Sequence, residues 1–97
     1  MATIDSRGLL TANGASFSED VTFTGAATNM VWDKSDNALE FVDNTKATFG
    51  TGADLQIYHD GSSSYVSDAG TGSLYLRGTN IIMDSAAGEK YIDLVAD

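Results

Sequence analysis

The only histidine of the chain lies in the stretch Tyr58-His59-Asp60-Gly61, where an imidazole and a carboxylate are neighbours. One interpretation is catalytic: His59 acts as a general base that Asp60 orients, and a serine from residues 62–64 acts as nucleophile. Adjacent residues of a strand point to opposite faces, so the imidazole and the carboxylate converge only if a turn bends the chain. The strand, Gly-x-Ser-x-Gly turn and helix typical of hydrolases do not occur in the surrounding sequence.

The same stretch also suits a strand that ends in a tight turn. Type I′ turns need positive φ at both central residues, a value that glycine adopts freely and aspartate tolerates. Asp60-Gly61 therefore predicts a type I′ turn, and His59 becomes the last residue of a strand. We favour this interpretation, and we predict that the protein is not an enzyme and has no catalytic residues.

Metal ligands are few. Transition metals are usually held by several His or Cys side chains, whereas this chain has one histidine and no cysteine. Residues 33–37, Asp-Lys-Ser-Asp-Asn, gather the oxygen ligands that calcium prefers. Neither an EF-hand loop nor the glycine-aspartate nonapeptide of calcium-binding β-rolls is present. Solvated strand ends and an ion at a subunit interface both remain open, and we predict no metal ligands and no cofactor.

The composition favours one acidic, folded domain. The chain has 97 residues, of which 42% are hydrophobic and 20% charged, too apolar for a disordered tail. With 14 acidic and 5 basic residues the net charge is −9, so we expect binding neither to nucleic acid nor to a membrane. The first residues lack the apolar run of a signal peptide, so a protein acting outside the cell is expected to leave by lysis or inside a particle.

The hydrophobic pattern has a period of two, which predicts an all-β chain. No window sustains helical spacing, and runs rich in Gly, Asn, Asp and Ser separate the alternating segments. We predict strands at residues 20–24, 29–33, 38–42, 46–50, 54–59, 64–68, 73–77, 80–84 and 90–95.

An internal copy is visible at an offset of sixteen residues. LEFVDNTKATF (39–49) aligns with LQIYHDGSSSY (55–65), and a partial third copy begins at LYLRG (74–78). The copies predict a short-stranded repeat meander, or a β-solenoid or β-prism, over residues 29–97. Residues 1–28 are rich in Ala, Ser, Thr and Gly and predict a slender N-terminal shaft or linker segment.

Strand alternation assigns the side chains of these copies to faces. Glu40, Gln56 and Tyr75 are predicted to point outward. The predicted assembly core consists of the apolar positions Leu39, Phe41, Phe49, Leu55, Ile57, Tyr65, Leu74 and Leu76. Such short strands make an apolar layer too thin to be covered by one chain, so we expect stacking on neighbouring repeats or on identical chains. The alternative is a carbohydrate-binding module, because outward tyrosines such as Tyr58 and Tyr75 can stack on sugar rings.

One resemblance is specific. LQIYHDGSSSYVSDAGTGSLYLRGTNIIM, followed by GEKYIDLVAD, closely resembles a repeat of tail-fibre and other structural proteins of marine phages, particularly those that infect cyanobacteria. LEFVDNTKATFGTGADLQIYHDGSSSY is similar to the same family, and together the matches cover about residues 29–97. The resemblance implies a β-rich, elongated homotrimer that belongs to a virion tail or appendage. A free-standing extracellular filament, and a role in binding a host surface glycan, remain the other expectations.

Overall fold

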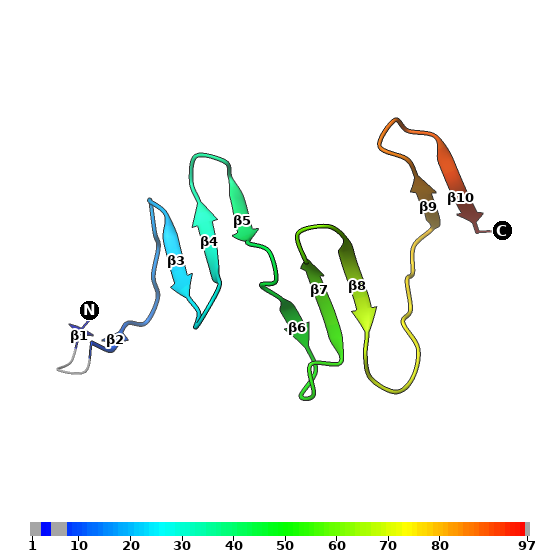
Figure 1. The fold of residues 1–97 in the computed structure, drawn as a ribbon. Coiled ribbons are helices and arrows are strands. Elements are labelled where there is room, and N and C mark those ends of the chain that lie inside the picture. The colour runs from blue at the N-terminus through cyan, green and yellow to red at the C-terminus, as the bar shows by residue number, and fades with distance from the viewer. Residues whose placement is uncertain (1–2, 5–7, 97) are drawn as a thin grey trace.

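The computed structural model describes residues 3–4 and 8–96 (Figure 1). Every regular element in these residues is a β-strand, and no described helix is long and apolar enough to cross a membrane. The strands are β1 Thr3–Ile4, β2 Leu10–Thr11, β3 Val21–Thr24, β4 Asn29–Asp33, β5 Ala38–Phe41, β6 Ala47–Phe49, β7 Leu55–His59, β8 Ser64–Asp68, β9 Asn80–Asp84 and β10 Lys90–Val95. The prediction of an all-β chain is confirmed.

The strands form four small antiparallel sheets in chain order (Figure 1). β1 pairs with β2, and β9 pairs with β10. Between these hairpins lie two sheets of three strands, with the orders β3-β4-β5 and β6-β7-β8. We call them the first and the second unit. Because β3 pairs with β4, the first unit crosses the predicted boundary between residues 28 and 29.

The strands of the first and second units recur at a constant step along the chain. They begin at Val21 and Ala47, at Asn29 and Leu55, and at Ala38 and Ser64, each pair 26 positions apart. The same step from β7 and β8 leads to Ile81 in β9 and to Lys90, the first residue of β10. This step, the distance in sequence from Val21 to Ala47, is called the structural repeat below.

The sixteen-residue copies do not share a structure, contrary to the prediction. Residues 55–65 run through a β-hairpin, β7 and the start of β8. Residues 39–49 instead run from β5 into β6, two strands of different sheets. The linker holds a local turn, in which the Thr45 amide donates to the Val42 carbonyl at 2.9 Å, and the Asn44 amide donates to the His59 carbonyl at 2.7 Å. The chain keeps its direction through this linker (Figure 1). Two similar sequences therefore form different strand pairings.

One predicted strand is missing. Residues 73–77 alternate like a strand but belong to no sheet; they form an extended connection between β8 and β9 (Figure 1). A strand is defined by its hydrogen-bonded partner, and the described chain offers this segment none. The prediction for residues 73–77 is therefore wrong for a single chain.

The described part of the chain is elongated and encloses no core. Its radius of gyration is 18.7 Å, whereas a compact domain of this length has about 13 Å. Its accessible surface is 8045 Å², against about 5,300 Å² expected for a folded monomer of this mass. None of the side chains from residue 8 to residue 96 is buried. About 2,700 Å² of surface that a compact fold hides is thus open to solvent.

Candidate assembly surface

The first unit has one apolar face. Residues directly opposite in antiparallel strands lie on the same face of a sheet. The register places Val21, Trp32 and Leu39 in one row. Phe23, Met30 and Phe41 form the next row of that face. Phe23 is 57% exposed and Leu39 50% exposed, so the face is open to solvent in the single chain.

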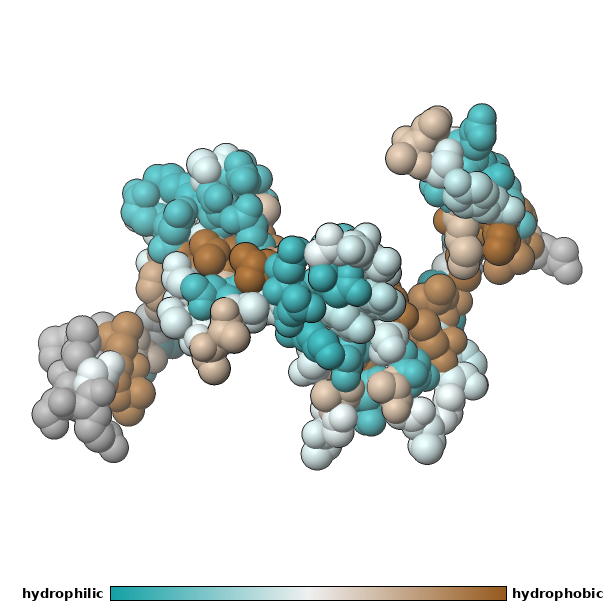
Figure 2. Space-filling model, in the orientation of Figure 1, coloured by the Kyte–Doolittle hydropathy of each residue, from teal (hydrophilic) through white to brown (hydrophobic). Residues whose placement is uncertain are grey.

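The second unit also has apolar side chains on one face. Ala47, Ile57 and Val66 form one row, and Phe49, Leu55 and Asp68 form the next, which ends in a carboxylate. Ile57 and Val66 are both exposed. In the view of Figure 2, hydrophobic residues gather over the first unit and over the connection that leads to β9, while the second unit presents mostly polar residues on this side. The two faces together are called the apolar surface below.

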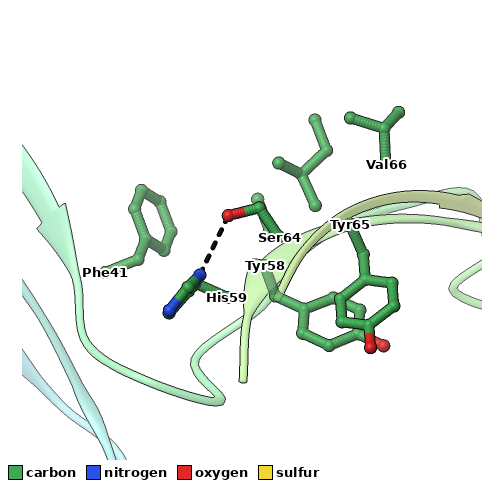
Figure 3. Close-up of a pocket in the computed structure, with 8 residues that line it drawn as sticks. Phe41, Tyr58, His59, Ser64, Tyr65 and Val66 are labelled. Carbon is green, nitrogen blue, oxygen red and sulfur yellow. Dashed lines mark hydrogen bonds between the residues drawn. The ribbon is translucent and has the colours of Figure 1, made fainter. Parts of the chain in front are cut away.

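The two parts of the apolar surface meet at a hollow. Phe41 from β5 lies near His59 at one side of a hollow of about 380 Å³ (Figure 3). The other residues that line this hollow belong to the second unit: Ala47, Ile57, Tyr58, Ser64, Tyr65 and Val66. An aromatic side chain from one unit and aliphatic side chains from the next thus share a single depression.

Most of the predicted assembly core belongs to this surface. Leu39, Phe41, Phe49, Leu55 and Ile57 lie on it. Tyr65 does not: it lies opposite Tyr58, on the other face of the second unit. Leu74 and Leu76 lie in the extended connection and on no sheet face.

Sequence reasoning missed four of the six residues named on the first unit's face. Val21, Phe23, Met30 and Trp32 were not among the predicted core positions, although they alternate regularly. The sixteen-residue comparison began at Leu39 and so excluded β3 and β4. A search at the step of the structural repeat aligns Phe23, Phe49 and Tyr75, and would have drawn attention to the earlier strands.

His59 lies at a turn, as predicted, but the turn has a different shape. Only Gly61 has positive φ, 97°, while Asp60 does not, which contradicts type I′. Asp60 Oδ1 accepts hydrogen bonds from the amides of Ser62 (2.9 Å) and Ser63 (2.7 Å). These amides lower the pKa of Asp60, because they stabilise the charged carboxylate.

The imidazole of His59 has a different partner from the carboxylate. Its Nδ1 lies 2.9 Å from Ser64 Oγ across the hairpin (Figure 3). The second oxygen of Asp60 accepts the Tyr65 hydroxyl at 3.2 Å. The serine and the histidine are therefore brought together, while both oxygens of the aspartate are engaged by the turn and the tyrosine.

The opposite face of the second unit carries a pair of tyrosines. The rings of Tyr58 and Tyr65 stack with centroids 4.8 Å apart and an interplanar angle of 18°. Lys46 Nζ lies 4.6 Å from the centroid of Tyr58. An ammonium does not fit between rings this close, so Lys46 covers the other side of Tyr58. Both sides of the Tyr58 ring are therefore covered.

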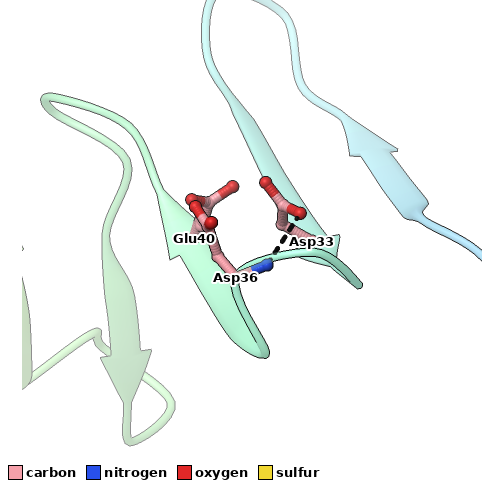
Figure 4. A group of neighbouring side chains, drawn as sticks. All are labelled: Asp33, Asp36 and Glu40. Atoms are coloured by element: carbon pink, nitrogen blue, oxygen red, sulfur yellow. Dashed lines mark hydrogen bonds between the residues drawn. The ribbon is translucent and has the colours of Figure 1, made fainter.

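The corresponding face of the first unit carries three carboxylates. Oxygens of Asp33, Asp36 and Glu40 lie within 4.8 Å of one another (Figure 4). Asp33 Oδ1 accepts Ser35 Oγ at 2.7 Å and the Ser35 amide at 2.9 Å, which lowers its pKa. Desolvation, and then the charge of Asp33, raise the pKa of Glu40. Exposed acidic groups of this kind are common without an ion, so the cluster alone indicates no metal site.

No protein-family model matches the chain, and neither the curated proteins nor the solved structures include a match to it.

Proposed function

We propose that the chain is a structural subunit that assembles with copies of itself into a rod, as part of a phage tail fibre or a similar extracellular filament. The observation that supports this proposal most is the apolar surface, none of whose residues is buried within the described chain. Covering apolar area stabilises by about 25 cal/mol per Å². A chain with such a surface gains free energy by pairing it with the same surface of another copy.

The exposed area is large enough for stable subunit contacts. The surface exceeds that of a compact monomer by about 2,700 Å², whereas a standard interface takes about 800 Å² from each partner. One chain can therefore contact two neighbours. In the proposed homotrimer, three apolar surfaces meet around a common axis and leave none exposed.

Charge suits this arrangement. Each copy carries a net charge of −9, and the acidic group of Asp33, Asp36 and Glu40 lies on the face opposite Met30 and Trp32. In the trimer the acidic faces point outward, where water and salt screen their repulsion.

A carbohydrate-binding module is the second candidate, and the tyrosine pair favours it less than the apolar surface favours assembly. Sugar rings stack on free aromatic faces. Tyr58 is covered by Tyr65 on one side and by Lys46 on the other, which leaves little of this pair for a ligand. Tyr75, at 72% exposure, is the more accessible ring, but Arg77 lies over it at 5.1 Å.

Light scattering after size-exclusion chromatography tests the proposal. For a homotrimer of the 10.2 kDa chain, the expected mass is about 31 kDa at neutral pH, and electron micrographs should show rods. A stable monomer in dilute solution contradicts self-assembly. Calorimetric titration with host polysaccharides separates the second candidate, because a monomer that binds sugar favours the carbohydrate-binding module.

A further inference from the structure

The structural repeat leaves a third unit without its first strand. One repeat after β6 the chain reaches residues 73–75, in the extended connection before β9. The third unit therefore consists of β9 and β10 only, and lacks a strand in the place that β3 and β6 fill in the other units.

One edge of β9 is unpaired, and this is the edge at which the missing strand would pair. β4 and β7 are each central strands with neighbours on both sides, whereas β9 pairs with β10 alone among the described strands. An open edge presents backbone amides and carbonyls that can pair with another strand. The edge is five residues long, Asn80–Asp84, which matches a strand of ordinary length.

Residues 73–77, which match the missing strand, have backbone groups without hydrogen-bond partners in the described chain. Residues 73–78 form no backbone hydrogen bond within the described part of the chain. Leu74 is 43%, Tyr75 72% and Leu76 57% exposed. Both the backbone and the apolar side chains of residues 73–77 therefore lack a partner that a sheet would supply.

The register of the first unit fits this segment to β9. In that unit Thr22 lies opposite Val31 and Thr24 opposite Asn29. Two structural repeats later, the equivalent pairs place Leu74 opposite Met83 and Leu76 opposite Ile81. Met83 and Ile81 share a face with Ile92 and Leu94, so both leucines would extend an apolar face.

The register of the second unit fits less well. There Thr48 lies opposite Gln56, which one structural repeat later places Leu74 opposite Ile82. A shift of one residue sends every side chain of a strand to the other face. Both leucines would then lie beside Ile82 and Asn80, away from the apolar face that Met83 and Ile81 form.

The chain direction favours a partner from another molecule. Residues 73–78 lead into β9 without reversing (Figure 1), so in this conformation they extend away from the edge that they match. We propose that residues 73–77 of one copy pair with β9 of a second copy in the register of the first unit, and so complete the third unit between chains. This inference rests on the proposed self-assembly, and it names a backbone contact that joins the copies.

Disulfide trapping tests the contact, because the natural chain has no cysteine. Opposite residues in antiparallel strands have Cα separations that suit a disulfide. Chains carrying Leu74→Cys and Met83→Cys, with different affinity tags, are refolded together and oxidised. We expect the mixed dimer to form about ten-fold faster than with the control pair Leu74→Cys and Ile82→Cys, because a held pair reacts at a high effective concentration. A second pair, Leu76→Cys with Ile81→Cys, guards against one variant that fails to fold.

Two results overturn the inference. One is a 74–82 link that forms as fast as the 74–83 link. The other comes from a single chain that carries both Leu74→Cys and Met83→Cys. If the link forms only within this chain and never between two chains, the segment folds back on its own β9. Light scattering on the same samples separates this inference from the proposed function: an oligomer without the 74–83 link removes only the strand contact, whereas a monomer removes self-assembly as well.

Discussion

The first and second units share an apolar face and differ in the face behind it. Behind the first unit lie Asp33, Asp36 and Glu40. Behind the second unit lie Tyr58 and Tyr65, with Lys46 over the Tyr58 ring. The shared face is the part expected to bind other copies, while the differing faces make contacts within each unit only. Variants that act on one face or one unit should therefore have separable effects.

A charge on the apolar face should have the largest effect. Phe49→Asp places a carboxylate where another copy is expected to pack, and burying an unpaired charge is strongly unfavourable. We expect association to weaken by about 3 kcal/mol or more, over a hundredfold in the dissociation constant. Light scattering across a dilution series measures this change.

Thr48→Asp is the matched control, because it adds the same residue to the same strand on the opposite face. Its effect on the oligomer mass should be small, since the carboxylate stays in water. Equal dissociation by both variants would show that the apolar surface does not determine assembly.

Substitutions at the turns between β4 and β5 and between β7 and β8 should have the next largest effect. Gly61 in the second unit has φ 97°, whereas the turn of the first unit uses Asn37 at φ 52°. Left-handed backbone costs a side-chain-bearing residue about 1–2 kcal/mol, so Gly61→Ala should destabilise the fold by that amount. Asn37→Gly should change stability by only a few tenths of a kcal/mol, because asparagine tolerates this conformation. Thermal melts at one fixed protein concentration compare the two, and an unchanged Gly61→Ala melt would contradict the strain at this turn.

Local strand propensity could be predicted from the sequence, because alternation needs only neighbouring residues. The strands near residues 29–33, 55–59 and 64–68 were found in this way. Which strands pair could not be predicted, because pairing depends on whether the linker between two strands reverses the chain. Residues 60–63 reverse it, and residues 42–46 do not, although the flanking sequences align.

The candidate surface was predictable to the same extent. Leu39, Phe41, Leu55 and Ile57 follow from alternation within one strand, and all four lie on the apolar surface. Tyr65 was assigned to it by aligning Phe49 with Tyr65, but the hairpin register pairs Tyr65 with Tyr58. Register across a turn is set by the loop, and a shift of one residue changes the face.

The tyrosine pair should give a smaller effect. Tyr58 and Tyr65 lie one structural repeat after Trp32 and Leu39, a pair on the apolar face of the first unit. A double-mutant cycle with Tyr58→Leu and Tyr65→Leu should give a coupling of about 0.5–1.5 kcal/mol in unfolding free energy. The oligomer mass should stay the same, because these rings face away from the apolar surface. A coupling near zero would mean that the stacked rings do not stabilise the second unit.

The carboxylates of the two units should give the smallest effects, and the effects should have opposite signs. The pKa of Glu40 is raised above 4.5, first by desolvation and then by Asp33, so its charged form opposes folding. The stability that the protonated Glu40 contributes to the fold is fully present below pH 4.5 and is lost as the pH rises through the folded pKa of Glu40. Glu40→Gln should therefore raise the melting temperature at pH 7 and have little effect near pH 4.

Asp60 in the second unit should behave in the reverse way. The amides of Ser63 and Ser62 lower its pKa below 3.8, so the charged form favours folding above that pH, and the gain is lost as the pH falls through the folded pKa. Asp60→Asn should lower the melting temperature at pH 7, with a difference that shrinks below pH 3.8. Both variants remove one negative charge from a chain of net charge −9, so a general charge effect would move both melts upward. Opposite shifts at pH 7 therefore require the local contacts of the two faces, whereas shifts in the same direction would show that only the total charge matters.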